Sequence, residues 1–203
     1  MNRPLTPQNG GQGVEVRPFK QGANTLSQAL LLTGAPGTGK TTIIREAISA
    51  SKAKAGGFYT QEIRQGGVRQ GFEIVTLDGS RAVLAHVDIR GPQRVSKYGV
   101  DVASLERVAV PALRRAIREC DVVVVDEIGK MELLSPGFRE VLLEALNSDR
   151  RLLGTVMLQP HPLADQVKKD PRVEVLLVSK ANRDHVFDRV TNWLRTPGAT
   201  VAK

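Results

Sequence analysis

Residues 34–41 read Gly-Ala-Pro-Gly-Thr-Gly-Lys-Thr and fit the pattern G-x-x-x-x-G-K-[ST] at every required position. Glycines in such a loop let the backbone turn tightly and approach phosphate groups, so that successive N–H groups can surround them. Lys40 would place a positive charge at the β- and γ-phosphates, and the Thr41 hydroxyl would bind Mg²⁺. The pattern therefore predicts a nucleotide-binding P-loop. The residues expected to bind the nucleotide here are Gly34, Ala35, Pro36, Gly37, Thr38, Gly39, Lys40, Thr41 and Thr42.

A pair of carboxylates, Asp126 and Glu127, follows four consecutive valines at residues 122–125. An acid at the end of a buried strand is the Walker B position of a P-loop protein. We expect Asp126 to reach Mg²⁺ through water, and Glu127 and Lys40 to be catalytic, with Glu127 the general base that activates the attacking water. A strand ending in Asp alone would suit a switch-type GTPase or a nucleotide kinase, whereas the following Glu favours hydrolysis. In the alternative interpretation Glu127 is a solvated carboxylate at a strand end.

Other polar residues could assist this chemistry. Thr155 ends a later expected strand, where its hydroxyl could hold the water or the γ-phosphate, or could simply satisfy backbone groups. Arg90, Arg94 and Lys97 fall in a segment, residues 88–99, that has no clear period and is expected to be a loop. One of these cations could stabilise charge in the transition state, although a basic loop is more often merely solvated.

The loop after the last expected strand, residues 179–183, is a candidate for base recognition. Lys180 could lay its aliphatic stem along the ring, and Asn182 offers both a donor and an acceptor to a base edge. Asn182 is an equally good N-cap for the helix expected after it, so both interpretations stay open.

The segments on either side of the P-loop have the hydrophobic patterns of a strand before it and a helix after it. Residues 26–33 contain an apolar run typical of a buried parallel strand, and residues 42–54 carry apolar residues at helical spacing. A helix that starts at the loop would direct its positive end at the phosphates. Further strands are expected at residues 57–63, 68–77, 81–86, 122–127, 151–157 and 173–178, and further helices at residues 105–119, capped by Ser104, and at 136–147, 163–169 and 183–194.

This alternation of strands and helices predicts an α/β fold with a mainly parallel sheet covered by helices on both faces. The glycines at positions 66 and 67 indicate a hairpin turn, so an antiparallel β-meander is expected to be inserted after the first helix. Ligands of such folds bind at the carboxyl ends of the parallel strands, where the P-loop and the two carboxylates are both expected.

The chain has 203 residues and 41% hydrophobic content, which is enough for one well-packed domain. We expect a flexible arm at residues 1–25, a single P-loop domain at 26–195 and a frayed tail at 196–203. The single cysteine, Cys120, excludes an intrachain disulfide and a zinc cluster and suits a reducing cytoplasm. No apolar run approaches the roughly 18 residues of a membrane span, so a cytoplasmic monomer with no membrane partner is expected.

The net charge of +8 raises the question of a nucleic-acid partner. The basic residues are dispersed, and only five Phe, two Tyr and one Trp are available to stack on bases. Attraction of a highly anionic nucleotide explains the sign of the charge equally well. Nucleoside triphosphates are therefore the expected partners, and nucleic acid remains a minor alternative.

Several longer segments resemble the thermostable nucleoside-triphosphatase family, which has a human relative known as cancer-related nucleoside-triphosphatase. Besides the P-loop, these segments are GFYTQEIR at residues 57–64, GFEIVTL at 71–77, KYGVD at 97–101 and DEIGKMEL at 126–133. The resemblance runs from about residue 26 to residue 194 and includes the segment SKANR at 179–183. The arm at residues 1–25 is a departure, because family members usually lack it or keep it short.

This resemblance implies a RecA-like P-loop fold and Mg²⁺-dependent hydrolysis of ATP, GTP and other nucleoside triphosphates to diphosphate and phosphate. Two other functions remain open on the residues alone. A nucleotide or small-molecule kinase would use the same P-loop with a phosphoryl acceptor in place of water. An ATP-gated switch would bind RNA or protein and use slow hydrolysis as its timer.

Overall fold

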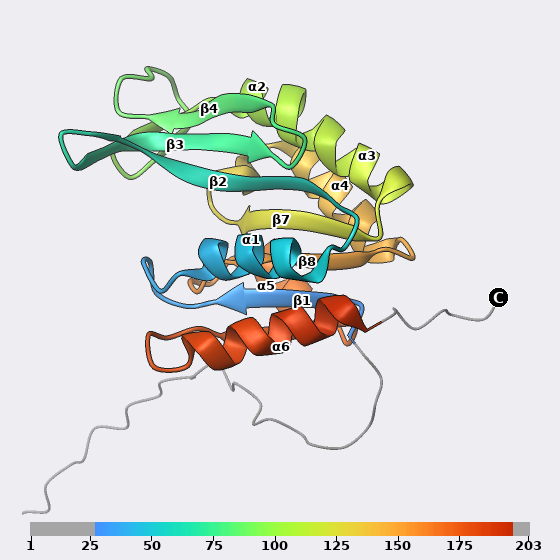
Figure 1. Ribbon diagram of the computed structural model, residues 1–203. Helices are drawn as coiled ribbons and strands as arrows, with labels where there is room; N and C mark the ends of the chain where they lie inside the picture. The colour runs from blue at the N-terminus through green and yellow to red at the C-terminus, as the bar shows by residue number, and fades with distance from the viewer. Residues whose placement is uncertain (1–26, 197–203) are drawn as a thin grey trace, which may run out of the picture.

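A computed structural model describes residues 27–196, so the predicted arm at residues 1–25 and the tail beyond Thr196 lie outside the described part. A nine-stranded sheet runs through the molecule in the order β5-β6-β4-β3-β2-β7-β8-β1-β9 (Figure 1). Its strands are β1 Ala29–Thr33, β2 Ala55–Gln65, β3 Val68–Thr76, β4 Arg81–His86, β5 Arg94–Val95, β6 Tyr98–Val100, β7 Val122–Ile128, β8 Arg151–Val156 and β9 Val173–Leu177. The helices are α1 Lys40–Ser51, α2 Val102–Ser104, α3 Val110–Glu119, α4 Pro136–Asn147, α5 Pro162–Lys169 and α6 Arg183–Arg195.

Five of these strands, β2, β7, β8, β1 and β9, pair in parallel and form the core. β1 and β7 are buried on both faces, which explains why their sequences are apolar runs rather than alternating patterns. β8 lies between β1 and β7, with Leu32 of β1 paired to Thr155 and Val125 of β7 paired to Gly154. The ends of these three strands therefore meet at one edge of the sheet.

The antiparallel part is the predicted meander. β2 extends past its parallel partner β7 and turns back into β3 through Gly66 and Gly67, whose φ angles of 55° and 78° suit a two-residue hairpin turn. The segment predicted as an irregular loop at residues 88–99 instead contains β5 and the first two residues of β6, which pair with each other, and β6 also pairs with β4. This prediction was wrong because strands of two and three residues are too short to show a period of two.

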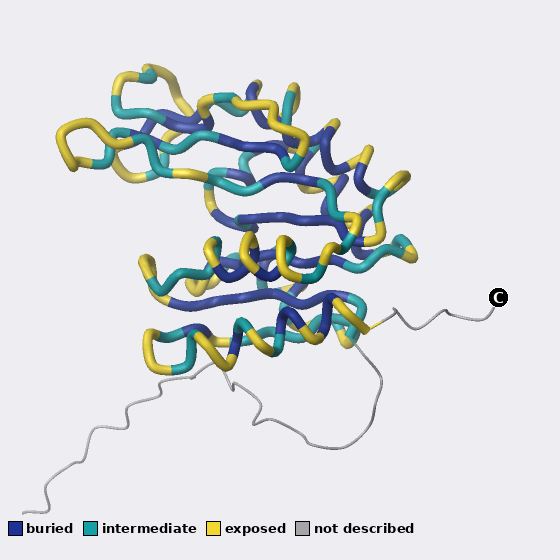
Figure 2. Tube along the Cα trace, in the orientation of Figure 1, coloured by how far each residue is buried: buried dark blue, intermediate teal, exposed yellow. Residues whose placement is uncertain are grey.

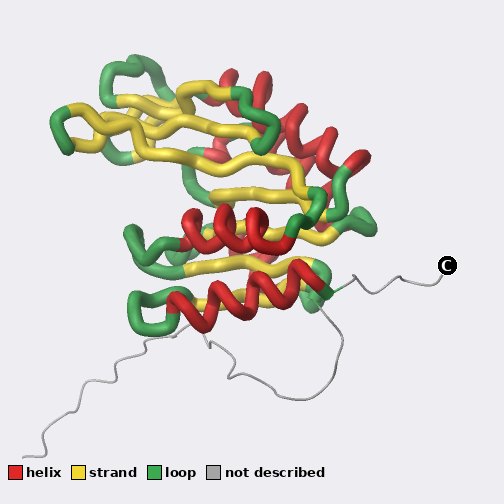
Figure 3. Tube along the Cα trace, viewed as in Figure 1, coloured by secondary structure: helices red, strands yellow, loops and turns green. Residues whose placement is uncertain are grey.

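Helices cover both faces of the sheet (Figure 3). The helices α1 and α6 pack on one face, over a buried cluster that includes Ile43, Trp193 and alternate residues of β1. The helices α3, α4 and α5 pack on the other face with Phe138 and Leu113 in the larger cluster. The strands between these layers are mostly buried, and the exposed backbone lies in the loops and on the outer sides of the helices (Figure 2).

The helix predicted at residues 105–119 begins earlier and is not uniform. Asp101, rather than Ser104, is its cap: the Asp101 carboxylate accepts a hydrogen bond from Ser104 N at 3.1 Å. A π-helix, Leu105–Ala109, then precedes α3. Pro111, in the first turn of α3, has no N–H to donate, so one α-helical hydrogen bond is missing at this point.

Candidate functional site

The P-loop, residues 34–39, connects β1 to α1 at the carboxyl edge of the sheet. Helix α1 begins at Lys40, two residues before the predicted start, so the free N–H groups of its first turn lie next to the loop. The φ angle of Gly34 is 144°, and its backbone lies so close to the segment after β9 that a Cβ on Gly34 would lie 2.3 Å from the carbonyl oxygen of Val178. The glycine at position 34 is therefore fixed by close packing as well as by backbone conformation.

Lys40 lies across the loop that precedes it. Its ammonium group donates hydrogen bonds to the carbonyl oxygens of Gly34, at 2.9 Å, and Ala35, at 3.1 Å. The Thr38 hydroxyl also donates to Ala35, at 3.0 Å. Hydrogen bonds from Thr38 and Lys40 thus stabilise the conformation of the loop, and they place the Lys40 ammonium beside its backbone.

Asp126 is the buried acid of the site, with a relative exposure of 2%. Its Oδ1 accepts a hydrogen bond from the Thr155 hydroxyl at 2.5 Å, and its Oδ2 is buried without a hydrogen-bond partner in the described residues. Burial raises the pKa of Asp126, while the hydrogen bond from Thr155, the nearby Thr41 hydroxyl and the charge of Lys40 act in the opposite direction. A buried, unpartnered carboxylate oxygen near a Thr hydroxyl is the type of oxygen ligand that Mg²⁺ prefers.

Glu127 is half-buried beside Asp126, and the peptide bond between the two residues is cis. Burial raises the pKa of Glu127, the negative charge of Asp126 raises it further, and Lys40 lowers it. The structure therefore brings Lys40, Thr41, Asp126, Glu127 and Thr155 together at one edge of the sheet.

A third acid, Glu132, lies close to Glu127. It belongs to a 3₁₀ helix, Glu132–Leu134, and its relative exposure is only 4%. A Cβ placed on Gly129 would lie 2.8 Å from Glu132 Oε2 and 3.3 Å from Glu127 Cδ, so both carboxyl groups reach the same point. Burial and the charge of Glu127 raise the pKa of Glu132 to about 8. Glu132 belongs to the segment at residues 126–133 that carries the family resemblance, but no local pattern indicates that it is buried, because a Glu after a loop is ordinarily solvated.

The basic segment at residues 90–97 does not reach this site. Arg94 belongs to β5, and β6, β4, β3 and β2 lie between that strand and β7. The Arg94 guanidinium donates to the carbonyl oxygen of Lys97 at 2.8 Å, and the Lys97 ammonium lies 5.4 Å from the centre of the Tyr98 ring. The structure thus places Arg94 and Lys97 several strands away from the P-loop, so these two cations are not partners of its phosphates.

Comparison with known proteins agrees with this geometry. A family model described as NTPase matches residues 29–191. The chain belongs to this NTPase family. It is 44% identical over 166 residues to the nucleoside-triphosphatase THEP1 of Thermotoga petrophila, a match that covers 82% of this chain and 92% of the relative. The human cancer-related nucleoside-triphosphatase is 37% identical over 189 residues, which cover 84% of this chain and 98% of the human protein.

Two solved structures of NTPase-family members have the same fold. The crystal structure of THEP1 from Aquifex aeolicus has a TM-score of 0.77 at 30% identity and covers 83% of this chain and 99% of its own. The solution structure of the human cancer-related nucleoside triphosphatase has a TM-score of 0.70 at 37% identity, with 86% and 99% covered. The predicted α/β fold with a parallel core and an antiparallel meander is confirmed, as is the family resemblance.

In this NTPase-family chain, the loop between β9 and α6 is held by Asn182. The Asn182 side-chain carbonyl accepts from the backbone N–H and the hydroxyl of Ser179, at 2.8 and 3.1 Å, and its amide donates to the carbonyl of Leu177 at 2.8 Å. Asn182 occupies the N-cap position of α6, as the capping interpretation expected, but its side chain makes no capping hydrogen bond with the helix. Lys180 is exposed on the same loop.

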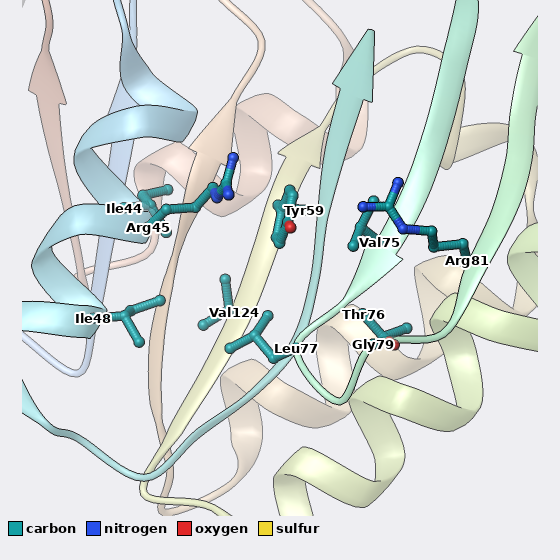
Figure 4. Close-up of a pocket in the computed structure, with 10 residues that line it drawn as sticks. All are labelled: Ile44, Arg45, Ile48, Tyr59, Val75, Thr76, Leu77, Gly79, Arg81 and Val124. Carbon is teal, nitrogen blue, oxygen red and sulfur yellow. The ribbon is translucent and has the colours of Figure 1, made fainter. Parts of the chain in front are cut away.

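A groove of about 350 Å³ opens on the α1 face of the sheet, between α1 and the first meander strands (Figure 4). Figure 4 shows its apolar floor below three larger side chains, those of Arg45, Tyr59 and Arg81. The Arg45 guanidinium lies 4.6 Å from the centre of the Tyr59 ring, and Tyr59 is paired in register with Asp126. The groove therefore lies next to the acidic site, since Val124 of β7 also lines it. Among residues 27–196, no helix is long and apolar enough to cross a membrane.

Proposed function

We propose that this protein hydrolyses nucleoside triphosphates to diphosphate and phosphate in an Mg²⁺-dependent reaction at the P-loop edge of the sheet. The observation that carries the proposal is the buried, unpartnered Oδ2 of Asp126 beside Thr41 and Lys40. Asp126 and Thr41 would hold Mg²⁺, which would supply charge neutralisation between the β- and γ-phosphates when bound.

Binding of the phosphates would fall to the backbone N–H groups of residues 34–42 and to Lys40. The first turn of α1 leaves N–H groups without partners in the helix, and the helix dipole favours an anion there. Phosphate oxygens would replace the Gly34 and Ala35 carbonyls as partners of the Lys40 ammonium. The Lys40 ammonium would then stabilise the negative charge that develops on the phosphates during the reaction.

Glu127 would accept the proton of the attacking water. Its raised pKa supports this role, because a general base works best when its pKa lies near the working pH. Its half-buried side chain also keeps contact with solvent, from which the water must come. Thr155 would fix the orientation of Asp126 rather than contact the γ-phosphate.

Base contact would come from the loop before α6. Lys180 is exposed there and would lay its stem along the ring, whereas Asn182 would hold the loop in shape, since both of its polar atoms already have partners. Any direct contact of Asn182 with the base would use the second N–H of its side-chain amide, because its carbonyl oxygen already accepts two hydrogen bonds from Ser179.

Release of phosphate from ATP, GTP, CTP and UTP, measured in parallel on one preparation without any acceptor, tests the proposed hydrolysis. Hydrolysis predicts Mg²⁺-dependent release that is lost in Lys40→Ala. A protein that releases no phosphate from any of the four would contradict the proposal.

Phosphoryl transfer to a small molecule is a second candidate function, and the groove between α1 and β3 is the observation that favours it. The groove lies beside Tyr59, next to the acidic site, and carries two arginines at its rim. A kinase would transfer phosphate only when an acceptor is added, so absence of release without acceptor, together with bound ATP, would favour this candidate.

A further inference from the structure

Two helices that begin at the nucleotide edge lie side by side. In Figure 1, α1 and α6 cover the same face next to β1, and the P-loop and the loop before α6 lie at the same end of the sheet. The first residue of α1 is Lys40, and the first residue of α6 is Arg183. Each helix thus places a cation in its first turn at this edge.

The Arg183 guanidinium lies directly against the P-loop. A Cβ placed on Gly39 would lie 3.2 Å from Arg183 Cζ, 3.2 Å from Nε and 3.4 Å from Nη1. The position of this Cβ is one bond from the Cα of Gly39, whose N–H belongs to the phosphate-binding backbone. The planar face of the guanidinium is therefore adjacent to the part of the loop that surrounds the α- and β-phosphates.

Among residues 27–196, Arg183 has only a loose ionic partner. Its guanidinium lies 3.9 Å from the Glu46 carboxylate, and the two side chains are 42% and 57% exposed. An exposed ion pair at this distance contributes little to stability. By contrast, Arg189 on the same helix donates to Glu174 at 2.8 Å, and both of these side chains are less than a third exposed. The position of Arg183 is thus not explained by its bond to Glu46.

The guanidinium is suited to a phosphate at this point. It is always charged, weakly hydrated and able to donate two parallel hydrogen bonds to phosphate oxygens. We propose that Arg183 binds the α- and β-phosphates of the nucleotide from the α6 side, opposite Lys40. This inference deepens the proposed hydrolytic function and rests on the use of the P-loop for phosphates.

A contact with the α- and β-phosphates has a specific kinetic consequence. These groups are present in the substrate and in the diphosphate product, so Arg183 would bind both. Binding that is equal in the ground state and the transition state lowers KM and does not raise kcat. Arg183 is therefore proposed as a residue that binds both the substrate and the diphosphate product.

The test measures affinity for ADP and for inorganic pyrophosphate by titration calorimetry in wild type, Arg183→Ala, Arg183→Lys and Glu46→Gln. Hydrogen bonds to charged groups predict a loss of about 10- to 100-fold for both ligands in Arg183→Ala. Arg183→Lys keeps the charge without the planar donor pair, so it should fall between Arg183→Ala and wild type. Glu46→Gln should stay within about twofold of wild type. KM for ATP should rise with the loss of affinity, while kcat stays within about threefold.

Pyrophosphate has no base, so it separates a phosphate contact from a base contact. An unchanged affinity for pyrophosphate in Arg183→Ala would overturn the inference. An equal loss in Glu46→Gln would also overturn it, because Arg183 would then act only by joining α6 to α1. Arg189→Ala, which removes a closer ion pair of the same helix, controls for loss of helix packing.

The same titration tests the P-loop separately. Lys40→Ala should lose affinity for ADP and pyrophosphate whether or not Arg183 contributes. Failure of wild type to bind either ligand would overturn the phosphate role of the P-loop and the inference together, whereas a loss confined to Lys40→Ala would overturn the inference alone.

Discussion

The Thr155 hydroxyl donates a hydrogen bond to Asp126 Oδ1 at 2.5 Å and leaves Oδ2 free to face the P-loop residues. The bond joins the ends of β8 and β7, which are neighbours because β8 lies between the strands that carry the P-loop and the acidic pair. One oxygen of the carboxylate is thus fixed by the protein, and the other is available to a metal ion or its water.

Thr155→Val keeps the shape of this side chain and removes its donor. Residues that orient metal ligands contribute about 10- to 100-fold to metal affinity, so the Mg²⁺ concentration for half-maximal activity should rise by about tenfold or more. Thr155→Ser retains the hydroxyl and should stay close to wild type. The measurement is a Mg²⁺ titration of phosphate release at saturating ATP, and equal midpoints for the three proteins would contradict the orienting role.

Glu127→Gln separates binding from chemistry. A general base typically contributes about 10²- to 10⁴-fold to the rate, so kcat should fall by about this factor while affinity for Mg-ATP changes little. Asp126→Asn should instead raise the Mg²⁺ requirement and weaken binding together, because it alters the proposed metal ligand. Single-turnover rates and nucleotide titrations distinguish the two, and a wild-type rate in Glu127→Gln would require another base.

Much of this site could be predicted from residue types and spacing. The P-loop pattern, the valine run before Asp126 and the apolar strand before Gly34 each have a local cause that the sequence displays. The order of the strands has no such local cause. The strand order places Thr155 next to Asp126 and places Arg94 several strands away from the P-loop. Because the sequence does not show this order, the expectation that the basic segment could act on the phosphates was wrong.

Other differences between prediction and structure concern residues whose role is decided by the surrounding fold. Asp101 and Ser104 are both good helix caps, and only the backbone path selects Asp101. Glu132 and Arg183 lie in segments that carry the family resemblance, but neither segment has a periodicity that shows where the two side chains point. The burial of Glu132 beside Glu127 and the contact of Arg183 with Gly39 depend on tertiary packing, which periodicity does not encode.

Asn182→Ala tests the loop before α6. Loss of the three hydrogen bonds that this side chain makes should lower the melting temperature and allow the exposed Lys180 to move relative to the base. We therefore expect a shift of several-fold in the ratio of purine to pyrimidine turnover, measured on ATP, GTP, CTP and UTP. Lys180→Ala should shift this ratio without a comparable loss of stability. Unchanged ratios in both variants would move base recognition to another segment.

Glu132→Gln tests the buried acid through the pH dependence of stability. The pKa of Glu132 is about 8 in the folded protein against 4.5 for an ordinary Glu. Between these values the unfolded chain has released a proton that the folded protein retains, so this group lowers the free energy of unfolding as pH rises, by at most about 1.4 kcal/mol per pH unit. Glu132→Gln removes this dependence, so its stability relative to wild type should increase from pH 5 to pH 8 in urea unfolding. Glu62→Gln is the control, because ion pairs with Arg64 and Arg69 lower the pKa of Glu62 and its contribution is constant over this range. A difference between wild type and Glu132→Gln that does not change with pH would show that Glu132 is ionised in the folded protein.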